Sequence, residues 1–498
     1  MNSVHYSNSK LNTDFGIEFT VECDMPNQRR YRATAGSFDM DCPFCGSKRK
    51  FNVNPRKNVA RCNKCSGDTG YNTVTLHAEL TGLSTKEAYK DLLRRWNGLS
   101  GDEQVEIKKR KVAAEAVKEI MPAPIEVRDK VYRRLLSQLD LSKKHREDLI
   151  RRGLTDEEIE KGLYKTVPVC GLHSLAAYAI KGIEFDENHG IPGFVDVNNP
   201  QKVLLRSRKN GYFVPVLTID GLISGMQIRY DNLKPTASEK EREMYKKYSW
   251  YSSSEKDTGC GVSGCENIHF AGDWSTVPKA CCLTEGVLKS DIASYLSGKP
   301  FMGLVGVNNV GQLTQTLTSL SEKGLESVYI YVDMDYRDKR EVKKALDNIK
   351  KKINQSGHIT FISGSENAKI TEGKGYIRFD VSKELPETML LFIGKALIPK
   401  EKVKAKGKSI FVDKDFLYEI RNTSHKITVV NGKGIDTENL TKEKRTLLIS
   451  KRGVTSFSFK KIGLTYHTIT WDEDYKGIDD YLLHLKTQGG PNQGINNF

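Results

Sequence analysis

The chain has 498 residues, 28% of them charged, and its net charge of +15 gives a sequence isoelectric point near 9.1. This length allows several domains with their own hydrophobic cores, and the basic balance favours a polyanionic partner such as nucleic acid. No apolar stretch could span a bilayer, and the polar start MNSVH is unlike a secretory signal. We therefore expect a cytoplasmic protein with no membrane partner.

The first motif with clear chemistry is a double Cys-x-x-Cys pattern. Cys42 and Cys45 are followed, after sixteen residues, by Cys62 and Cys65. Four thiolates at this spacing can hold one tetrahedral Zn²⁺, and the residues on either side of Asn54-Pro55 supply a hairpin between the two pairs. A redox Cys-x-x-Cys would not need a second pair, so we favour structural zinc.

The segments around this motif predict local structure. The alternation of apolar and polar residues over 17–21 predicts a strand. Ser84 and Glu87 predict a capping box at the start of a helix that carries Ala88, Leu92 and Trp96 on one face. Residues 102–118 are charged and poor in aromatic side chains, which is typical of a tether that can be helical.

The cysteine motif also resembles that of a known family. Cys-Pro-Phe-Cys, then Phe51, Val53 and Pro55, then Cys-Asn-Lys-Cys, is similar to the zinc-binding domain of DnaG-type bacterial primases. One ligand in that family is commonly His, whereas all four are Cys here. The resemblance implies a zinc-ribbon template-binding domain at 1–100 and a linker at 101–127.

The middle of the chain begins with two capped helices and continues with strands. Ser142 predicts one helix start, and Thr155 with Glu158 predicts the next. We expect His145 to be a surface or capping histidine rather than a catalyst. Residues 211–216 and 222–229 predict a hairpin across Asp220-Gly221.

This order of strands, followed by a Lys-Tyr pair, resembles the subdomain that precedes the catalytic domain in DnaG-type primases. The resemblance implies a basic subdomain at 128–279. It also implies that nucleotide phosphates or template are bound by Arg229 and Lys247, and less directly by Arg206 and Arg208. Arginine suits bidentate phosphate contacts, and lysine acts as a point charge.

The stretch from Cys281 to Asp335 predicts the reactive centre. Three short apolar runs alternate with helical segments, which is typical of a parallel α/β sheet. Glu285 ends the first run, and Asp333 and Asp335 end the third. Because ligand sites lie beyond the carboxyl ends of parallel strands, we expect these acids to converge and to hold Mg²⁺ or Mn²⁺.

The acidic pattern resembles the Toprim domain that primases, topoisomerases and some nucleases share. The resemblance implies a Rossmann-like Toprim domain at 280–363 and 465–498, where Asp479 or Asp480 completes the metal crevice. Lys289 stands where the family often has Asp, which implies a changed metal stoichiometry or nucleotide affinity and makes Lys289 a substrate-binding candidate. Residues 364–464 form an insertion to which the sequence assigns no role.

These inferences define a multidomain α/β protein: a zinc ribbon with helices, a mixed α+β basic subdomain and a Toprim domain. We expect a DNA-dependent RNA primase that uses single-stranded DNA and nucleoside triphosphates, as found in phages, plasmids and other mobile elements. No Walker A pattern appears, so a replicative helicase would be a separate partner. A Toprim nuclease and a non-catalytic replication protein that binds single-stranded DNA remain alternatives.

Overall fold

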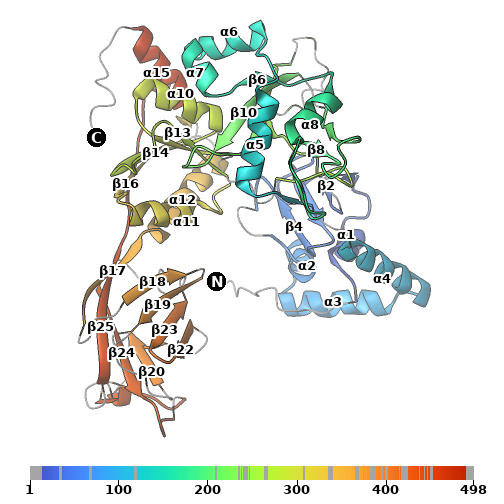
Figure 1. Cartoon of the computed structure of the whole chain (residues 1–498). Coiled ribbons are helices and arrows are strands. Elements are labelled where there is room, and N and C mark those ends of the chain that lie inside the picture. Colours follow the sequence, from blue (N-terminus) through green and yellow to red (C-terminus); the bar gives the residue numbers. More distant parts are fainter. Residues whose placement is uncertain are drawn as a thin grey trace.

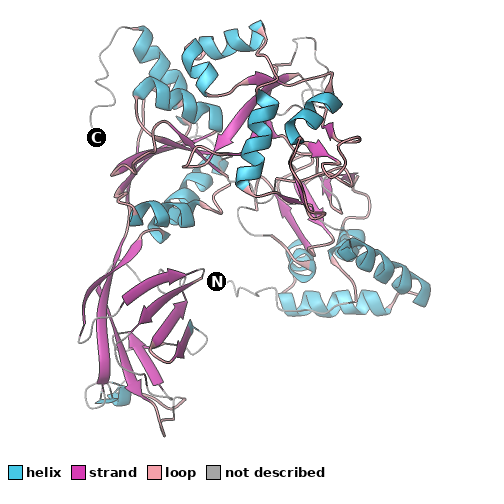
Figure 2. Cartoon of the chain, viewed as in Figure 1, coloured by secondary structure: helices cyan, strands magenta, loops and turns pink. Residues whose placement is uncertain are grey.

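A computed structural model describes residues 14–488 with internal gaps. The residues outside the description are 33–35, 67–69, 117–119, 208–209, 234–235, 237, 239–244, 246, 263–266, 307–308, 335–339, 365–368, 374, 381–384, 386–388, 394–395, 399–401, 414–415, 417–423, 437, 442, 446 and 449–452. Figure 1 shows an N-terminal module (blue), a central α/β core (green and yellow) and a module at the other side of the core (orange). Figure 2 shows that this last module consists mainly of strands.

The N-terminal module packs helices against a small antiparallel sheet. Its strands are β1 (Tyr31–Arg32), β2 (Phe38–Met40), β3 (Phe51–Asn54) and β4 (Val59–Cys62), paired in chain order. Its helices are α1 (Ile17–Asp24), α2 (Thr73–Thr81), α3 (Thr85–Asn97) and α4 (Gly101–Ala116). The predicted capping box of Ser84 and Glu87 is confirmed at the start of α3, whose Ala88, Leu92 and Trp96 are buried.

The strand predicted at 17–21 is wrong, because this segment is α1. Ile17 and Val21, one helical turn apart, pack into the core of the small sheet. Phe15 and Phe19, with the same spacing, pack against Trp96 of α3. A short helix that packs on two sides, together with Phe15 just before it, produces the same alternation in sequence as a strand with one buried face.

The segment that the sequence predicts as the basic subdomain contains an antiparallel sheet in the order β12-β11-β10-β6. The predicted hairpin is confirmed as β10 (Gly211–Leu217) and β11 (Ile223–Tyr230). The helices between residues 121 and 250 are α5 (Ile125–Leu136), α6 (Lys143–Arg151), α7 (Asp156–Lys161) and α8 (Leu172–Ile180). The remaining strands of this range are β5 (Met121–Pro122), β6 (Lys165–Thr166), β7 (His189–Gly190), β8 (Phe194–Val195), β9 (Leu204–Leu205) and β12 (Tyr248–Trp250).

The sheet that carries the candidate acids has helices on both faces. Its order is β13-β15-β14-β16-β26, in which only β13 (Ile268–Ala271) runs antiparallel to its neighbour. The parallel strands are β14 (Ala280–Glu285), β15 (Phe301–Leu304), β16 (Ser327–Tyr331) and β26 (Thr465–Thr468). Side chains of α11 (Leu313–Glu322) and α12 (Arg340–Gln355) pack on one face, and those of α10 (Val287–Ser297) and α15 (Ile478–Thr487) pack on the other. The predicted mixed α/β architecture with a parallel sheet is confirmed.

Between α12 and β26 the chain forms a module of two antiparallel sheets. One has the order β17-β25-β24-β20-β21 and the other β18-β19-β23-β22. Their bounds are β17 (His358–Gly364), β18 (Lys369–Gly373), β19 (Tyr376–Asp380), β20 (Met389–Ile393), β21 (Ala396–Leu397), β22 (Val403–Lys406), β23 (Ser409–Asp413), β24 (Ser424–Asn431) and β25 (Gly453–Ile462). The strand expected at 358–362 therefore pairs with β25 of this module. Across the described parts of the chain, no helix has the length and apolar character needed to cross a membrane.

Candidate metal centres and basic cluster

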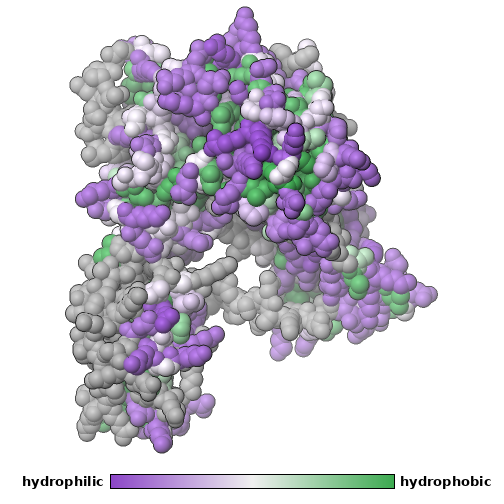
Figure 3. Space-filling model, in the orientation of Figure 1, coloured by the Kyte–Doolittle hydropathy of each residue, from purple (hydrophilic) through white to green (hydrophobic). Residues whose placement is uncertain are grey.

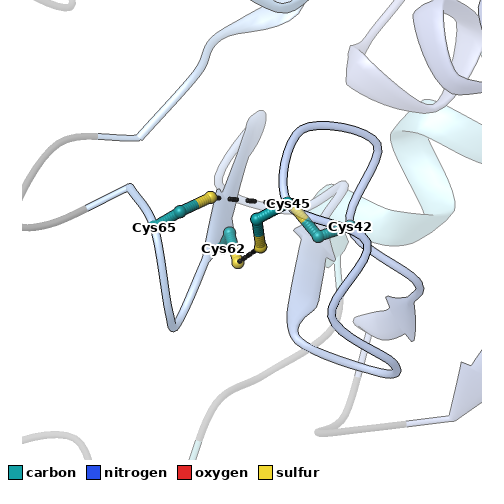
Figure 4. Close-up of side chains that lie close together, drawn as sticks. All are labelled: Cys42, Cys45, Cys62 and Cys65. Carbon is teal, nitrogen blue, oxygen red and sulfur yellow. Dashed lines mark hydrogen bonds between the residues drawn. The ribbon is translucent and has the colours of Figure 1, made fainter. Parts of the chain in front are cut away.

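The two cysteine pairs come together at one end of the β3–β4 hairpin (Figure 4). Their sulfur atoms all lie within 4.8 Å of one another. The Sγ–Sγ distance is 3.7 Å for Cys42 and Cys65 and 3.8 Å for Cys45 and Cys62. Four sulfurs at about 2.3 Å from a tetrahedral Zn²⁺ lie about 3.8 Å apart, and the distances within these two pairs match that value. The predicted four-cysteine cluster is confirmed, and it supports a structural zinc ion.

The local backbone explains this geometry. The hairpin register pairs Phe51 with Cys62, which anchors the second pair beside the first strand of the hairpin. The Lys64 N–H donates a hydrogen bond to Cys62 Sγ at 3.3 Å. Such backbone donors stabilise a metal-bound thiolate, because they compensate its negative charge.

The second candidate centre lies at the carboxyl edge of the parallel sheet. Glu285 is the last residue of β14, and Asp333 follows β16 by two residues. The two strands are adjacent and parallel, so their ends meet at one edge. Gly286 has φ = +90°, and this backbone conformation starts α10 directly after Glu285. Asp479 arrives from the first turn of α15 on the same side.

Lys289 lies between two of these acids. Its Nζ contacts Asp333 Oδ1 directly and lies 3.6 Å from Glu285 Oε1. Lys476 reaches the other oxygen of Asp333 at 3.6 Å. Lys289 is one helical turn after Glu285, which places its ammonium group back over the strand ends. An ammonium group thus compensates the acids at the position where the resembled family often has a carboxylate.

Asp333 and Asp479 are buried and Glu285 is partly buried, and removal from water changes the proton affinity of Glu285 and Asp479. Removal from water, together with the adjacent Asp333 carboxylate, raises the pKa of Glu285 to about 7, although Lys289 acts in the opposite direction. Burial likewise raises the pKa of Asp479, against the attraction of Lys289 and Arg152. Asp479 Oδ1 is buried and has no hydrogen-bond partner within the described part of the chain. A buried carboxylate oxygen without a donor is unfavourable unless a proton or a cation satisfies it.

The other predicted acids have different placements. Asp480 is exposed on α15, whereas its neighbour Asp479 is buried. Asp335 lies outside the described residues. Within the described ranges, the four cysteines are the only group of three or more potential metal-binding side chains whose ligand atoms lie within 4.8 Å of one another. Glu285, Asp333 and Asp479 therefore lie at one edge of the sheet, but their oxygen atoms are not all as close to one another as the four sulfur atoms are.

A basic cluster, formed by Arg152, Arg229 and Lys247, lies next to Asp479. Arg152 Nε and Arg229 Nη2 lie 3.2 Å and 3.5 Å from Asp148 Oδ2. Arg229 is 3% exposed, and its Nε has no hydrogen-bond partner among the described atoms. Partial removal from water and the charges of Arg152 and Arg229 lower the pKa of Lys247, while Asp479 acts in the opposite direction. The charges of the basic cluster and of Asp479 are therefore close enough to influence each other.

Two features hold the basic subdomain against the parallel sheet. Gly153 has φ = +99°, and a Cβ there would lie 2.9 Å from Leu483 of α15, so the turn after α6 can approach α15 closely. A buried hydrogen-bond chain adds a second connection. Tyr164 Oη donates to Asp291 Oδ2 at 2.6 Å, His269 Nε2 donates to Asp291 Oδ1 at 2.7 Å, and the Leu217 N–H donates to His269 Nδ1 at 2.9 Å.

The remaining predicted residues lie elsewhere. Arg206 pairs with Glu255, and within the described residues no ion pair joins it to the acids. Arg208 lies outside the described residues. The expectation of a surface position for His145 is wrong. It is 5% exposed, and its Nδ1 and Nε2 lie 2.8 Å from Thr166 Oγ1 and 2.9 Å from Asp231 Oδ1.

Sequence reasoning missed Arg152 and Lys476. Arg152 caps the C-terminus of α6 and looked like a helix-end residue, and Lys476 is an exposed residue of the turn before α15. Their one signal in the sequence is that each precedes a glycine, Gly153 or Gly477. A Cβ at Gly477 would lie 2.4 Å from Asp479 Oδ1, so the glycine leaves room for this carboxylate.

Comparison with known proteins gave structural similarities alone. No family model and no curated protein matches the sequence. The structure is similar to the zinc-binding and RNA polymerase domains of Aquifex aeolicus primase, with 14% identity, 69% of this chain and 75% of that chain covered, and a TM-score of 0.32. A DnaG primase catalytic domain bound to single-stranded DNA shares 14% identity over 45% of this chain and 66% of that chain, with a TM-score of 0.29.

The primase fragment of the bacteriophage T7 primase-helicase shares 12% identity over 62% of this chain and 82% of that fragment, with a TM-score of 0.23.

Proposed function

We propose that the protein is a DNA-dependent RNA primase, which joins ribonucleotides into short primers on a single-stranded DNA template. The observation that carries the proposal is the shared edge of Glu285, Asp333 and Asp479, which faces the basic cluster of Arg152, Arg229 and Lys247. Acidic groups at the ends of parallel strands suit divalent cations, and adjacent guanidinium and ammonium groups suit phosphates.

The catalytic unit of this proposal is a Toprim-type domain of residues 280–363 and 465–498, with 364–464 inserted into it. Glu285, Asp333 and Asp479 would hold Mg²⁺ or Mn²⁺, together with Asp335 and with Asp480 as the more exposed candidate. The partnerless Asp479 Oδ1 and the raised pKa of Glu285 favour a site at which oxygen atoms bind a cation. Bound Mg²⁺ would supply charge neutralisation for the triphosphate and the primer 3′-oxygen.

The protein groups have distinct roles in this proposal. Arg229 is fixed by Asp148 and by its contact with the Tyr230 carbonyl, at 3.2 Å from Nη1, so its guanidinium is oriented before substrate arrives. Lys247 adds an exposed positive charge beside it, and Lys289 compensates the acids until a substrate phosphate replaces one of them as its partner. The zinc ribbon of residues 1–100 would bind the template, and 101–127 would link it to the basic subdomain of residues 128–279.

Incubation with labelled ribonucleoside triphosphates, single-stranded DNA and Mg²⁺ or Mn²⁺ tests the proposal. Short oligoribonucleotides are the expected product, and Glu285→Gln and Asp333→Asn should abolish them while the protein stays folded. Glu160→Gln, an exposed position on α7, is the matched control. Scission of the DNA would support a Toprim nuclease, and binding without either product would support a non-catalytic replication protein. Either outcome contradicts a primase.

The biological setting belongs to the same proposal. A phage, plasmid or integrative element would supply the template, and a separate replicative helicase would expose it. Addition of such a helicase should raise primer yield on duplex templates and leave the yield on single-stranded templates unchanged.

A further inference from the structure

The module between α12 and β26 has one surface whose side chains are both aromatic and basic. In β19 and β23, alternate residues Ile377, Phe379, Ile410 and Val412 point inward and pack against the second sheet of the module. The opposite face of the same strands carries Tyr376, Arg378 and Phe411, and β22 adds Lys404 and Lys406. We call these five residues the aromatic-basic face.

The strand register brings these residues together. Arg378 and Lys404 are the two cross-strand neighbours of Phe411. The rings of Tyr376 and Phe411 lie 5.3 Å apart with an interplanar angle of 70°, and Arg378 Cζ lies 5.7 Å from the Phe411 ring centre. A hollow of about 780 Å³ opens beside them and is lined by Tyr376, Phe411, Lys402, Lys404 and Lys406, among others.

The acids on this face are already engaged with other groups. Asp380 accepts hydrogen bonds from Arg378 at 2.6 Å and from Ser409 at 2.5 Å. Asp413 accepts one from the Phe416 N–H at 2.8 Å and lies 3.6 Å from Lys402. Lys404 and Lys406 are exposed, and so is Tyr376, with 39% of its surface accessible. The face therefore presents positive charge beside a solvent-exposed ring.

The module as a whole also carries a net positive charge. Residues 364–464 contain 21 Lys and Arg against 12 Asp and Glu, a net charge of +9 out of +15 for the entire chain. Figure 3 shows hydrophilic side chains gathered over the β19, β22 and β23 region of this module. An exposed aromatic ring, packed on a second ring and next to lysines, is a combination that a merely soluble surface does not require.

We propose that the aromatic-basic face is a second binding site for single-stranded DNA, separate from the acidic edge and the basic cluster. Unpaired bases stack on aromatic rings, and lysines bind the phosphates that follow. Duplex DNA has no free base faces to offer such rings. An acidic protein partner would use the lysines and leave the rings unexplained. The choice of DNA over RNA rests on the proposed function, in which the unpaired strand is a DNA template.

Equilibrium binding of the full-length protein to a long oligothymidylate, in chelator and without nucleotides, tests this site. Tyr376→Ala should raise the Kd at least about fivefold, because loss of a stacked base has a cost of this order. Tyr376→Phe should restore binding. Lys404→Gln with Lys406→Gln should lower the slope of log K against log salt by about 1.4, as expected for two lost phosphate contacts.

The matched control is Lys433→Gln with Lys444→Gln, which removes the same charge from exposed positions elsewhere in the module. Its Kd and salt slope should equal those of the parent protein. Equal values for both double variants, or an unchanged Kd for Tyr376→Ala, would overturn the proposal. The proposal would also be overturned if this face bound duplex DNA or single-stranded RNA more tightly than single-stranded DNA. In that case Tyr376→Ala would raise the Kd for those ligands more than the Kd for single-stranded DNA.

Photocrosslinking to a halogenated oligodeoxynucleotide gives an independent test. The expected result is an adduct in the peptide that contains Tyr376 or Phe411, in addition to any adducts from the core. Adducts confined to the core would contradict the site. Primer synthesis on saturating template separates this proposal from the proposed function. Synthesis should persist in Tyr376→Ala, because Tyr376 lies outside the proposed catalytic site.

Discussion

Substitution of Glu285 by Gln removes a partly buried carboxylate whose charged form is unfavourable in the metal-free protein. The pKa of Glu285 is about 7, compared with 4.5 for an ordinary glutamate, because of burial and the neighbouring Asp333. The folded protein thus binds this proton more tightly than the unfolded chain does. The stabilising effect is fully present below about pH 4.5 and is lost as the pH rises through about 7.

The difference between the two pKa values corresponds to about 3 kcal/mol. Glutamine cannot ionise, so the variant does not lose this free energy. In chelator, the free energy of unfolding of Glu285→Gln should rise relative to the parent protein by about 3 kcal/mol between about pH 4.5 and about pH 8. For a cooperative unit of about 150–250 residues, this difference corresponds to a rise in Tm of about 6–12 °C.

Thermal unfolding of both proteins across this pH range measures the effect. Glu160→Gln, on the exposed side of α7, is the control for the loss of one carboxylate. Added Mg²⁺ should stabilise the parent protein and not the Glu285→Gln variant, because the ion needs the carboxylate. A difference between Glu285→Gln and parent that stays flat with pH would refute the reasoning.

Three further predictions follow from the same contacts. Lys289→Met leaves Glu285 and Asp333 without the ammonium that now contacts both, so it should destabilise the metal-free protein by about 3–5 kcal/mol, with recovery in Mn²⁺, as measured by chemical denaturation. Cys62→Ser should reduce bound zinc, measured by elemental analysis, from one ion per chain to less than half an ion per chain, and should expose residues 38–62 to proteolysis. Cys23→Ser is the control, and an equal zinc content in the two variants would count against the four-cysteine site. Arg152→Gln should raise the KM for nucleoside triphosphates about tenfold, the effect of losing roughly one charged hydrogen bond, whereas exposed Arg94→Gln should leave the KM unchanged.

Those parts of the fold that depend on local sequence could be predicted from it. The spacing of the four cysteines, the Ser84–Glu87 capping box and the hairpin around Asp220-Gly221 each involve residues close in the chain. The parallel strands β14 and β16 were predictable for another reason. Buried strands covered by helices on both sides are apolar throughout, and such runs are visible without any knowledge of their neighbours.

What could not be predicted depends on contacts between distant segments. The strand predicted at 17–21 is a helix because α1 contacts the small sheet and α3 at once, and neither contact is visible in the local alternation. Arg152 lies near Asp479 because the turn at Gly153 packs against α15, more than 300 residues further along the chain. The burial of His145 likewise follows from Asp231, which arrives from the end of β11.

The insertion illustrates the same limit. Its lysines and its single exposed tyrosine on β19 have no recognisable motif, and only the register of β19, β22 and β23 places Tyr376, Phe411 and Lys404 on one surface. A one-residue change of that register would turn these side chains toward the core of the module.

Anomalous diffraction from crystals that contain Mn²⁺ tests the central claim most directly. The account predicts a manganese peak at the carboxyl edge of the parallel sheet, with oxygen ligands from Glu285, Asp333 or Asp479 and with Lys289 Nζ displaced from its position between the first two. A manganese peak elsewhere, with Lys289 still between Glu285 and Asp333, would contradict the account.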